Sequence, residues 1–424
     1  MGAEAPVGDR AGCRRVKIRD VKIIVTCPGR NYVVVKIETD EPGIYGVGDA
    51  TLNGRELAVA TILREHIAPL LIGRDPDRIE DIWQYLTRGG YWRGGPVQMT
   101  AVSGIDLALW DIKGKVAGLP VYSLLGGRTR IGALAYGHAC GATHVELLDE
   151  VRRRIDEGFR VVRVQVAVPG QAASYGIDTA YAQLGPETGI GDGGALPILE
   201  KDWEVQAYLR SVPRMLEFLR SELGDSVALC HDAHGRLTPI EAARLARDVE
   251  PFGLLFLEDP VRSEHRNGLE LVRRSSTTPL AAGELYTSVY DVLDPITGQL
   301  IDYVRCDIAH VGGLTAARKI AAIAEPFGVR TAWHGPDDIG PAAHAANVHL
   351  NCSIPNFGVQ EYPALTGVVL DVLPGAPELI DGSLFPSDAP GLGVDVDEKL
   401  AARFPYQRQY LPTVRLIDGS VHDW

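Results

Sequence analysis

The sequence predicts an α/β protein built around a barrel of parallel strands, with a smaller domain in front of it. Short apolar runs that end in a carboxylate recur at 227–232, 255–258 and 279–284. Such runs, bounded by glycine, proline and charge, are typical of strands buried on both faces. Their terminal carboxylates are 26 residues apart, about the length of one strand, loop, helix and return in a β/α barrel. A chain of 424 residues is also too long for one ordinary core.

The smaller domain is expected at 16–130. The residues before it, 1–15, carry glycine, proline and mixed charge without an apolar core, so we expect a disordered extension and not a signal peptide. Residues 16–49 predict a strand meander, because 21–25 and 32–37 are rich in β-branched residues. Helices follow, and the clearest apolar stripe with helical spacing consists of Val102, Ile105, Leu109, Ile112 and Val116.

The barrel is expected at 131–372, where strand and helix patterns alternate. The expected strands are 131–136, 161–166, 227–232, 254–258, 280–284, 303–306, 330–333 and 357–361. Helix signals lie between them, such as the capping box Thr238-Pro-Ile-Glu241. The connection 168–195 is exceptionally long and rich in glycine, proline, alanine and glutamine, so we expect it to reach the mouth of the barrel. The tail 373–424 is rich in proline and glycine and is expected to pack back on the smaller domain.

Composition excludes several classes of partner. The formal net charge is −13 and there is no basic run, so nothing favours nucleic acid or an anionic membrane surface. No transmembrane segment is evident in the sequence. The six cysteines are scattered without CxxC spacing, which indicates reduced thiols in a cytoplasmic protein.

Asp232, Glu258 and Glu284 are the candidate metal ligands. Equal spacing places them at the carboxyl ends of neighbouring parallel strands, facing one mouth. Three carboxylates in a confined space repel one another and shift towards protonation, and a hard divalent cation such as Mg²⁺ removes that conflict. For any single one of them, pairing with arginine or lysine is the more ordinary explanation.

These residues resemble the metal triad of the enolase superfamily. More narrowly, His231-Asp232-Ala233-His234, Leu257-Glu258-Asp259 and Gly283-Glu284 resemble its mannonate dehydratase group, and the likeness extends from about Val16 to Trp424. The resemblance implies a (β/α)7β modified TIM barrel with an N-terminal α+β capping domain that covers the mouth. It also implies one Mg²⁺ per subunit and a homo-oligomer, a tetramer or octamer.

Arg163 and Tyr175 are the first candidates for proton abstraction. Superfamily sites often carry Lys-x-Lys on the second strand, but this strand has Arg163 and no lysine; the mannonate dehydratase group has arginine there and tyrosine twelve residues later, as here. A guanidinium favours tyrosinate, lowering a phenol pKa that is ordinarily about 10. The alternative is that Arg163 forms an ion pair and Tyr175 packs.

Three further residues are candidates for acid–base work. His234 lies two residues after Asp232 and faces the same side of the strand, and the resemblance implies a general acid for the departing 3-hydroxyl. Asp307 and His334 are 27 residues apart, one barrel step, and resemble the His–Asp pair of mandelate racemase. Equally open is that Asp307 caps the following helix or pairs with a neighbour.

The resemblance also implies a set of substrate contacts. These are Asn53, His138, Arg305, Asp338, Glu361 and Trp424. Arg305 ends the sixth strand and is chemically suited to hold a carboxylate.

The expected activity is Mg²⁺-dependent dehydration of D-mannonate, D-gluconate or both to 2-keto-3-deoxy-D-gluconate through an enediolate. The chain has Pro336 after His334-Gly335, where efficient mannonate enzymes of the group carry alanine, and this departure implies weak or relaxed activity that includes gluconate. The alternatives are a racemase or epimerase that uses His334 and Asp307, and a sugar-acid-binding protein with little catalysis.

Overall fold

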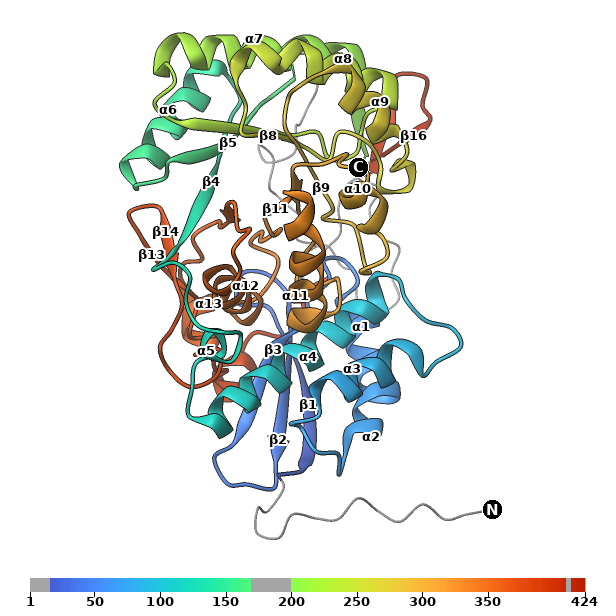
Figure 1. Cartoon of the computed structure of the whole chain (residues 1–424), viewed down its shortest axis with the longest axis vertical. Helices are drawn as coiled ribbons and strands as arrows, with labels where there is room; N and C mark the ends of the chain where they lie inside the picture. The colour runs from blue at the N-terminus through green and yellow to red at the C-terminus, as the bar shows by residue number, and fades with distance from the viewer. Residues whose placement is uncertain (1–15, 169–199, 409–412, 424) are drawn as a thin grey trace.

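The computed structural model describes residues 16–168, 200–408 and 413–423. In Figure 1 a three-stranded sheet with helices occupies one end of the molecule and a barrel with surrounding helices the other. Tyr175 and Trp424, and nearly all of the connection 168–195, lie outside the described residues. No helix among the described residues has the length and apolar character needed to cross a bilayer.

The N-terminal domain begins with an antiparallel meander in the order β1-β2-β3, as the β-branched runs predict. The strands are β1 (Ile18–Thr26), β2 (Tyr32–Thr39) and β3 (Tyr45–Asp49). The helices are α1 (Glu56–Ile62), α2 (Ala68–Leu71), α3 (Ile79–Arg88), α4 (Pro96–Ala117) and α5 (Val121–Leu124), with the π-helix Leu63–Ile67 between α1 and α2.

Helix α4 packs directly on β3. Proline stands at its first turn and Gly118 ends it in the left-handed conformation at φ 66°. A Cβ at Gly46 or Gly48 would lie 1.9 Å and 2.0 Å from backbone oxygens of α4, so this close approach requires glycine. The predicted apolar stripe is buried except at Val116, which is 56% exposed in the last turn of α4.

The barrel has the predicted (β/α)7β order among the described residues. Its strands are β4 (Ala133–Gly141), β5 (Val161–Val166), β7 (Ala228–Asp232), β8 (Phe256–Glu258), β9 (Leu280–Ala282), β10 (Tyr303–Val304), β11 (Arg330–Thr331) and β12 (Gln360–Glu361). Consecutive strands pair in parallel from β4 to β11. The bridge Thr331–Phe357 and the pairing of β12 with β4 close the barrel. The intervening helices are α6 (His144–Asp156), α7 (Val205–Leu223), α8 (Pro239–Val249), α9 (Gly268–Ser275), α10 (Leu293–Thr297), α11 (Gly313–Ala324) and α12 (Pro341–Ser353).

A layer of inward side chains fills the barrel below its mouth. Each strand, or the residue adjoining it, contributes one member: Tyr136, Val161, Cys230, Phe256, Ala281, Tyr303, Ala332 and Val359. This is the packed interior expected of a β/α barrel. Because side chains of a strand alternate, the residues two positions later lie above this layer, towards the carboxyl ends.

The C-terminal region divides between the two parts of the molecule. The hairpin β13 (Glu378–Ile380) and β14 (Ser383–Phe385) follows α13 (Val368–Val372) and pairs with β4. Helix α14 (Glu398–Ala401) contacts the N-terminal domain, where Glu398 forms ion pairs with Lys22 and Lys36. Strands β15 (Thr413–Leu416) and β16 (Val421–His422) instead join β6 (Glu200–Trp203) beside the barrel, so this last part does not pack on the N-terminal domain as expected.

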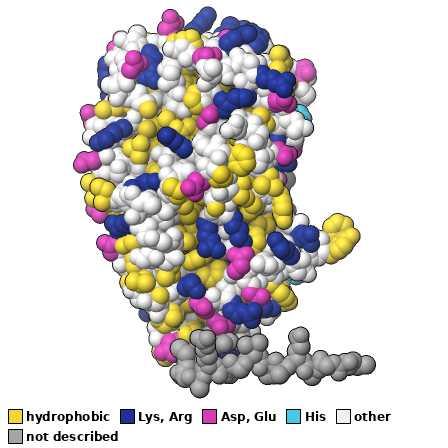
Figure 2. Space-filling view, in the orientation of Figure 1, with side chains coloured by type: hydrophobic (Ala, Val, Ile, Leu, Met, Phe, Trp, Pro, Cys, Tyr) yellow, Lys and Arg dark blue, Asp and Glu magenta, His cyan; other side chains and the backbone are white. Residues whose placement is uncertain are grey.

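Surface charge is mixed. Figure 2 shows basic and acidic side chains interspersed over the visible face, with no continuous basic patch. This distribution agrees with the net charge and offers no track for a nucleic-acid backbone on that face.

Candidate active site

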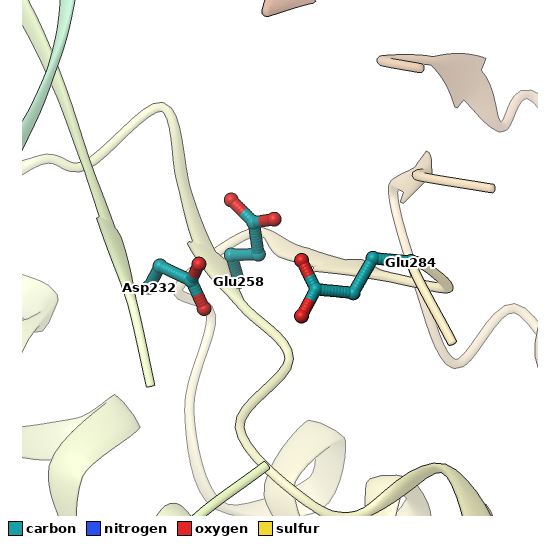
Figure 3. Close-up of side chains that lie close together, drawn as sticks. All are labelled: Asp232, Glu258 and Glu284. Atoms are coloured by element: carbon teal, nitrogen blue, oxygen red, sulfur yellow. The ribbon is translucent and has the colours of Figure 1, made fainter. Parts of the chain in front are cut away.

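Three carboxylates from neighbouring strands converge at the mouth of the barrel. Asp232 and Glu258 are the last residues of β7 and β8, and Glu284 follows β9 by two residues. One oxygen of each lies within 4.8 Å of the others, and Figure 3 shows the three side chains pointing towards a common space. Burial and repulsion from Asp232 raise the pKa of Glu284 to about 8. An all-oxygen set of this kind fits a hard divalent cation, which would offset the repulsion.

Cationic side chains hold two of these carboxylates from outside the triad. Arg163 Nη1 on β5 donates to Asp232 Oδ2 at 3.1 Å. Arg163 and the His234 ring, whose Nε2 is 2.9 Å from the same oxygen, keep the pKa of Asp232 low although burial opposes this. His234 has a positive φ of 51°, a strained conformation that is more common at functional sites than elsewhere.

Arg305 differs from its expected position as an open carboxylate clamp. Its side chain is fully buried, and its guanidinium contacts Glu258 and donates to Glu361 Oε2 at 2.8 Å and to the carbonyl of Ala332 at 3.1 Å. The spacing correctly predicted that Arg305 lies at the end of the sixth strand. It did not show that Glu258 and Glu361 take up the guanidinium donors. Arg305 therefore lies buried among these acids and holds Glu258 and Glu361 in place.

His334 and Asp307 form a hydrogen-bonded pair on the opposite side of the triad from β5. The residues are joined by a parallel bridge past the ends of β10 and β11, and His334 Nδ1 lies 2.7 Å from Asp307 Oδ2. His334 Nε2 lies 3.4 Å from Glu284 Oε2, so the ring faces the candidate metal site. Burial lowers the pKa of His334, but Glu361, Asp307 and Glu284 outweigh it and raise the pKa to about 10.

Two protein-family models match the parts of the chain that carry this site and the domain in front of it. The model of the enolase C-terminal domain-like family matches residues 146–400, and that of the mandelate racemase / muconate lactonizing enzyme N-terminal domain matches residues 13–126. The chain belongs to the enolase superfamily. The resemblance read from the three carboxylates and their flanking residues is thereby confirmed.

Two curated relatives and one solved structure illustrate how close the similarity is. A D-mannonate dehydratase of Caulobacter sp. (strain K31) is 50% identical over 409 residues, 96% of this chain and 100% of that protein. A D-galactonate dehydratase family member of Marinomonas sp. (strain MWYL1) is 49% identical with the same coverage. The crystal structure of an enolase from Pantoea ananatis with bound D-gluconate and magnesium has a TM-score of 0.87 at 44% identity, covering 96% of this chain and 100% of that one.

Four of the residues expected to contact the substrate are hydrogen-bonded to one another in two pairs. His138 Nε2 on β4 lies 2.6 Å from Glu361 Oε1 on β12. Asn53, from the N-terminal domain, donates to Asp338 Oδ2 at 2.9 Å, so that pair joins the two domains beside the mouth. Burial lowers the pKa of His138 to about 4, so its ring is neutral and can donate or accept according to its tautomer.

Three side chains near the site were not anticipated from the sequence. Gln165, two residues after Arg163 on β5, is buried and its Nε2 donates to the carbonyl of Asp232 at 3.5 Å. Asp259 is buried beside Glu258 and accepts from the amide of Gly283. His310 lies close to Asp307. The two-residue strand period could have found Gln165, whereas the other two depend on turns that no periodicity describes.

Proposed function

We propose that this chain is a Mg²⁺-dependent sugar-acid dehydratase that converts D-mannonate, D-gluconate or both into 2-keto-3-deoxy-D-gluconate. The observation that carries the proposal is the carboxylate triad with a His–Asp pair facing it. Relatives named as D-mannonate dehydratase and a similar structure holding D-gluconate and magnesium support the substrate class. We also propose a cytoplasmic homo-oligomer, a tetramer or octamer, which light scattering would test.

Asp232, Glu258 and Glu284 would hold one Mg²⁺ per subunit. When bound, the cation would act as a Lewis acid that stabilises the negative charge developing on the substrate carboxylate as C2 loses its proton. The contact of Arg163 helps to keep Asp232 ionised, and the contact of Arg305 holds Glu258 and offsets part of the burial that raises its pKa. Asn53, His138, Asp338, Glu361 and Trp424 are proposed to contact the hydroxyl groups of the sugar acid.

Two bases are proposed for the two faces of the substrate. D-Mannonate and D-gluconate differ only in configuration at C2, so their C2 protons point to opposite faces when the carboxylate is held in one place. Arg163 lies on the second strand of the barrel, β5, and His334 follows the seventh, β11. We therefore propose that the base supported by Arg163 and the base His334 serve opposite faces of the substrate, with Tyr175 as the base on the side of β5. Asp307 bound to Nδ1 directs Nε2 of His334 towards the mouth; because the pKa of the ring is raised to about 10, His334 must lose its Nε2 proton before it can receive the C2 proton there.

His234 is proposed as the general acid. The C2–H bond breaks, the C3–O bond breaks, and His234 returns a proton to the departing 3-hydroxyl, which leaves as water; the enol then becomes the 2-keto acid. Burial lowers the pKa of His234 to about 4, so the ring must take up a proton from solvent before it can act as an acid, and negative charge that accumulates on the reacting substrate favours this uptake.

Epimerisation is a second candidate function. The 2.7 Å contact between His334 and Asp307 favours it, because a base on each face can exchange the C2 proton without loss of the 3-hydroxyl. Pro336 restricts the backbone beside His334, so we expect relaxed rather than efficient action on D-mannonate.

A screen of hexonates with and without Mg²⁺ tests the proposal. Dehydration is followed as 2-keto-3-deoxy product, and epimerisation as C2 deuterium exchange without product. We expect slow product formation from D-gluconate, D-mannonate or both, abolished by chelation. Activity that survives chelation would refute the metal role, and tight hexonate binding with neither exchange nor product would indicate a non-catalytic binder.

A further inference from the structure

Asp307 faces two histidines rather than one. Its Oδ2 lies 2.7 Å from His334 Nδ1 and 3.7 Å from His310 Nε2, while Oδ1 accepts from the amide of Ala309 at 2.6 Å. The carboxylate is fully buried. A buried carboxylate without a metal is stabilised by its few neighbours, so each of them influences its orientation.

The turn after β10 brings His310 back over Asp307. The amides of His310 and Val311 both donate to the carbonyl of Asp307, at 3.0 Å and 2.9 Å. Backbone geometry therefore places the imidazole of His310 next to the same oxygen, Asp307 Oδ2, that bonds to His334.

The N-terminal domain fixes this turn. Thr100, a fully buried residue of α4, places its hydroxyl 2.9 Å from His310 Nδ1. Gly312, two residues after His310, is held by two further bonds. Its carbonyl accepts from Trp83 Nε1 at 2.8 Å, and its amide donates to Ser103 Oγ at 2.9 Å. Side chains of α3 and α4 thus hold the turn that carries His310.

The hydroxyl contact also bears on the tautomer of His310. If Thr100 donates to Nδ1, the ring proton resides on Nε2 and faces Asp307 Oδ2. At 3.7 Å the contact is too long for a hydrogen bond, but an N–H facing that oxygen favours the ionised carboxylate electrostatically. An ionised Asp307 keeps the Nδ1 proton of His334 in place, so that Nε2, which faces Glu284, is the nitrogen that exchanges a proton.

We propose that His310 is a positioning residue for proton transfer by His334, and that Thr100 sets its tautomer, so that the N-terminal domain takes part in base catalysis. This inference rests on the proposed function, in which His334 serves one face of the substrate. His310 contacts neither substrate nor metal ligands; it acts through Asp307.

The test compares C2 deuterium exchange on the two epimers in four variants. His310→Phe removes the ring nitrogens, His310→Gln restores an N–H donor, Thr100→Val removes the hydroxyl and Thr100→Ser retains it. The epimer served by His334 is the one whose exchange is lost in His334→Asn. For that epimer we expect His310→Phe to lower kcat about tenfold, the scale on which losing a partner that orients histidine acts, with little change in KM. His310→Gln should recover part of the loss, and the other epimer should be unaffected.

A matched control and a measurement independent of turnover separate this role from packing. His349 is likewise buried and its Nδ1 accepts from the amide of Tyr122, far from the mouth, so His349→Asn should leave the ratio of the two epimers unchanged. The low-field NMR signal of the His334 Nδ1 proton should shift in His310→Phe and Thr100→Val but not in Thr100→Ser.

Equal loss on both epimers, or an unshifted signal, would overturn the role of His310 while leaving the dehydratase proposal intact. Exchange that His334→Asn does not affect would instead overturn the assignment of His334 and the dependent role of His310. Absence of exchange from every hexonate in the wild type would refute the proposed function itself.

Discussion

Replacing Asp307 with asparagine tests the His–Asp pair most directly. Asparagine keeps the shape and can still accept from the amide of Ala309, but it removes the negative charge that faces His334 at 2.7 Å. A hydrogen bond to a charged group contributes about 1.5–3 kcal/mol. At about 1.4 kcal/mol per factor of ten, its loss should slow proton transfer by His334 by about tenfold to about 150-fold.

The assay is solvent-deuterium exchange at C2 of D-gluconate and D-mannonate, measured for each epimer with saturating Mg²⁺. We expect the loss on one epimer only, with the other reduced by less than about threefold, since that face is served from β5. Asp302→Asn is the control, because Asp302 adjoins the opposite end of β10, is 42% exposed and pairs with Arg273. Equal losses on both epimers in Asp307→Asn, with an unchanged melting temperature, would refute the two-face arrangement.

Three further predictions follow from the same structure. Glu258→Gln should abolish Mg²⁺-dependent turnover while the circular dichroism spectrum and fold remain, and calorimetric Mg²⁺ binding as tight as in the wild type would contradict the ligand assignment. Tyr175→Phe should abolish exchange on the epimer that His334 does not serve with little change in Mg²⁺ affinity, and full activity on both epimers would remove Tyr175 from the mechanism. Burial raises the pKa of Asp106 to about 7, above its ordinary 3.8, so its contribution to stability is full below about pH 4 and is lost progressively as pH rises to about 7. Asp106→Asn can still accept from the amide of Thr315, so it should flatten the fall in melting temperature between about pH 4 and about pH 7, and an unchanged slope would count against a neutral Asp106.

Most of the barrel could be predicted because its strands are apolar on both faces and end in charge. The strand expected at 161–166 has those bounds as β5. Later strands are shorter than expected: β10 ends at Val304 rather than at 306, and beyond it only single backbone contacts continue, such as the bridge between Asp307 and His334. The even 26-residue step was enough to bring the three candidate ligands together.

Contacts between side chains of distant strands were less predictable. Nothing in the spacing of Arg305 indicates that Glu258 and Glu361 occupy its donors, because that choice depends on three strands packing at once. The second histidine beside Asp307 depends on a turn and on a hydroxyl from another domain. Sequence periodicity describes elements one at a time and therefore misses such arrangements.

The layer of apolar side chains inside the barrel has a consequence for how this chemistry can diversify. Several strands place a polar residue two positions after their member of the layer, such as Asp232 after Cys230 and Glu258 after Phe256, whereas Glu284 follows Ala281 by three. A substitution at one upper position leaves the other strands anchored by their own apolar members. New reactions can therefore arise by exchange of single functional groups while the apolar layer stays the same. Deleting one residue within a strand would instead turn the functional group of that strand out of the mouth.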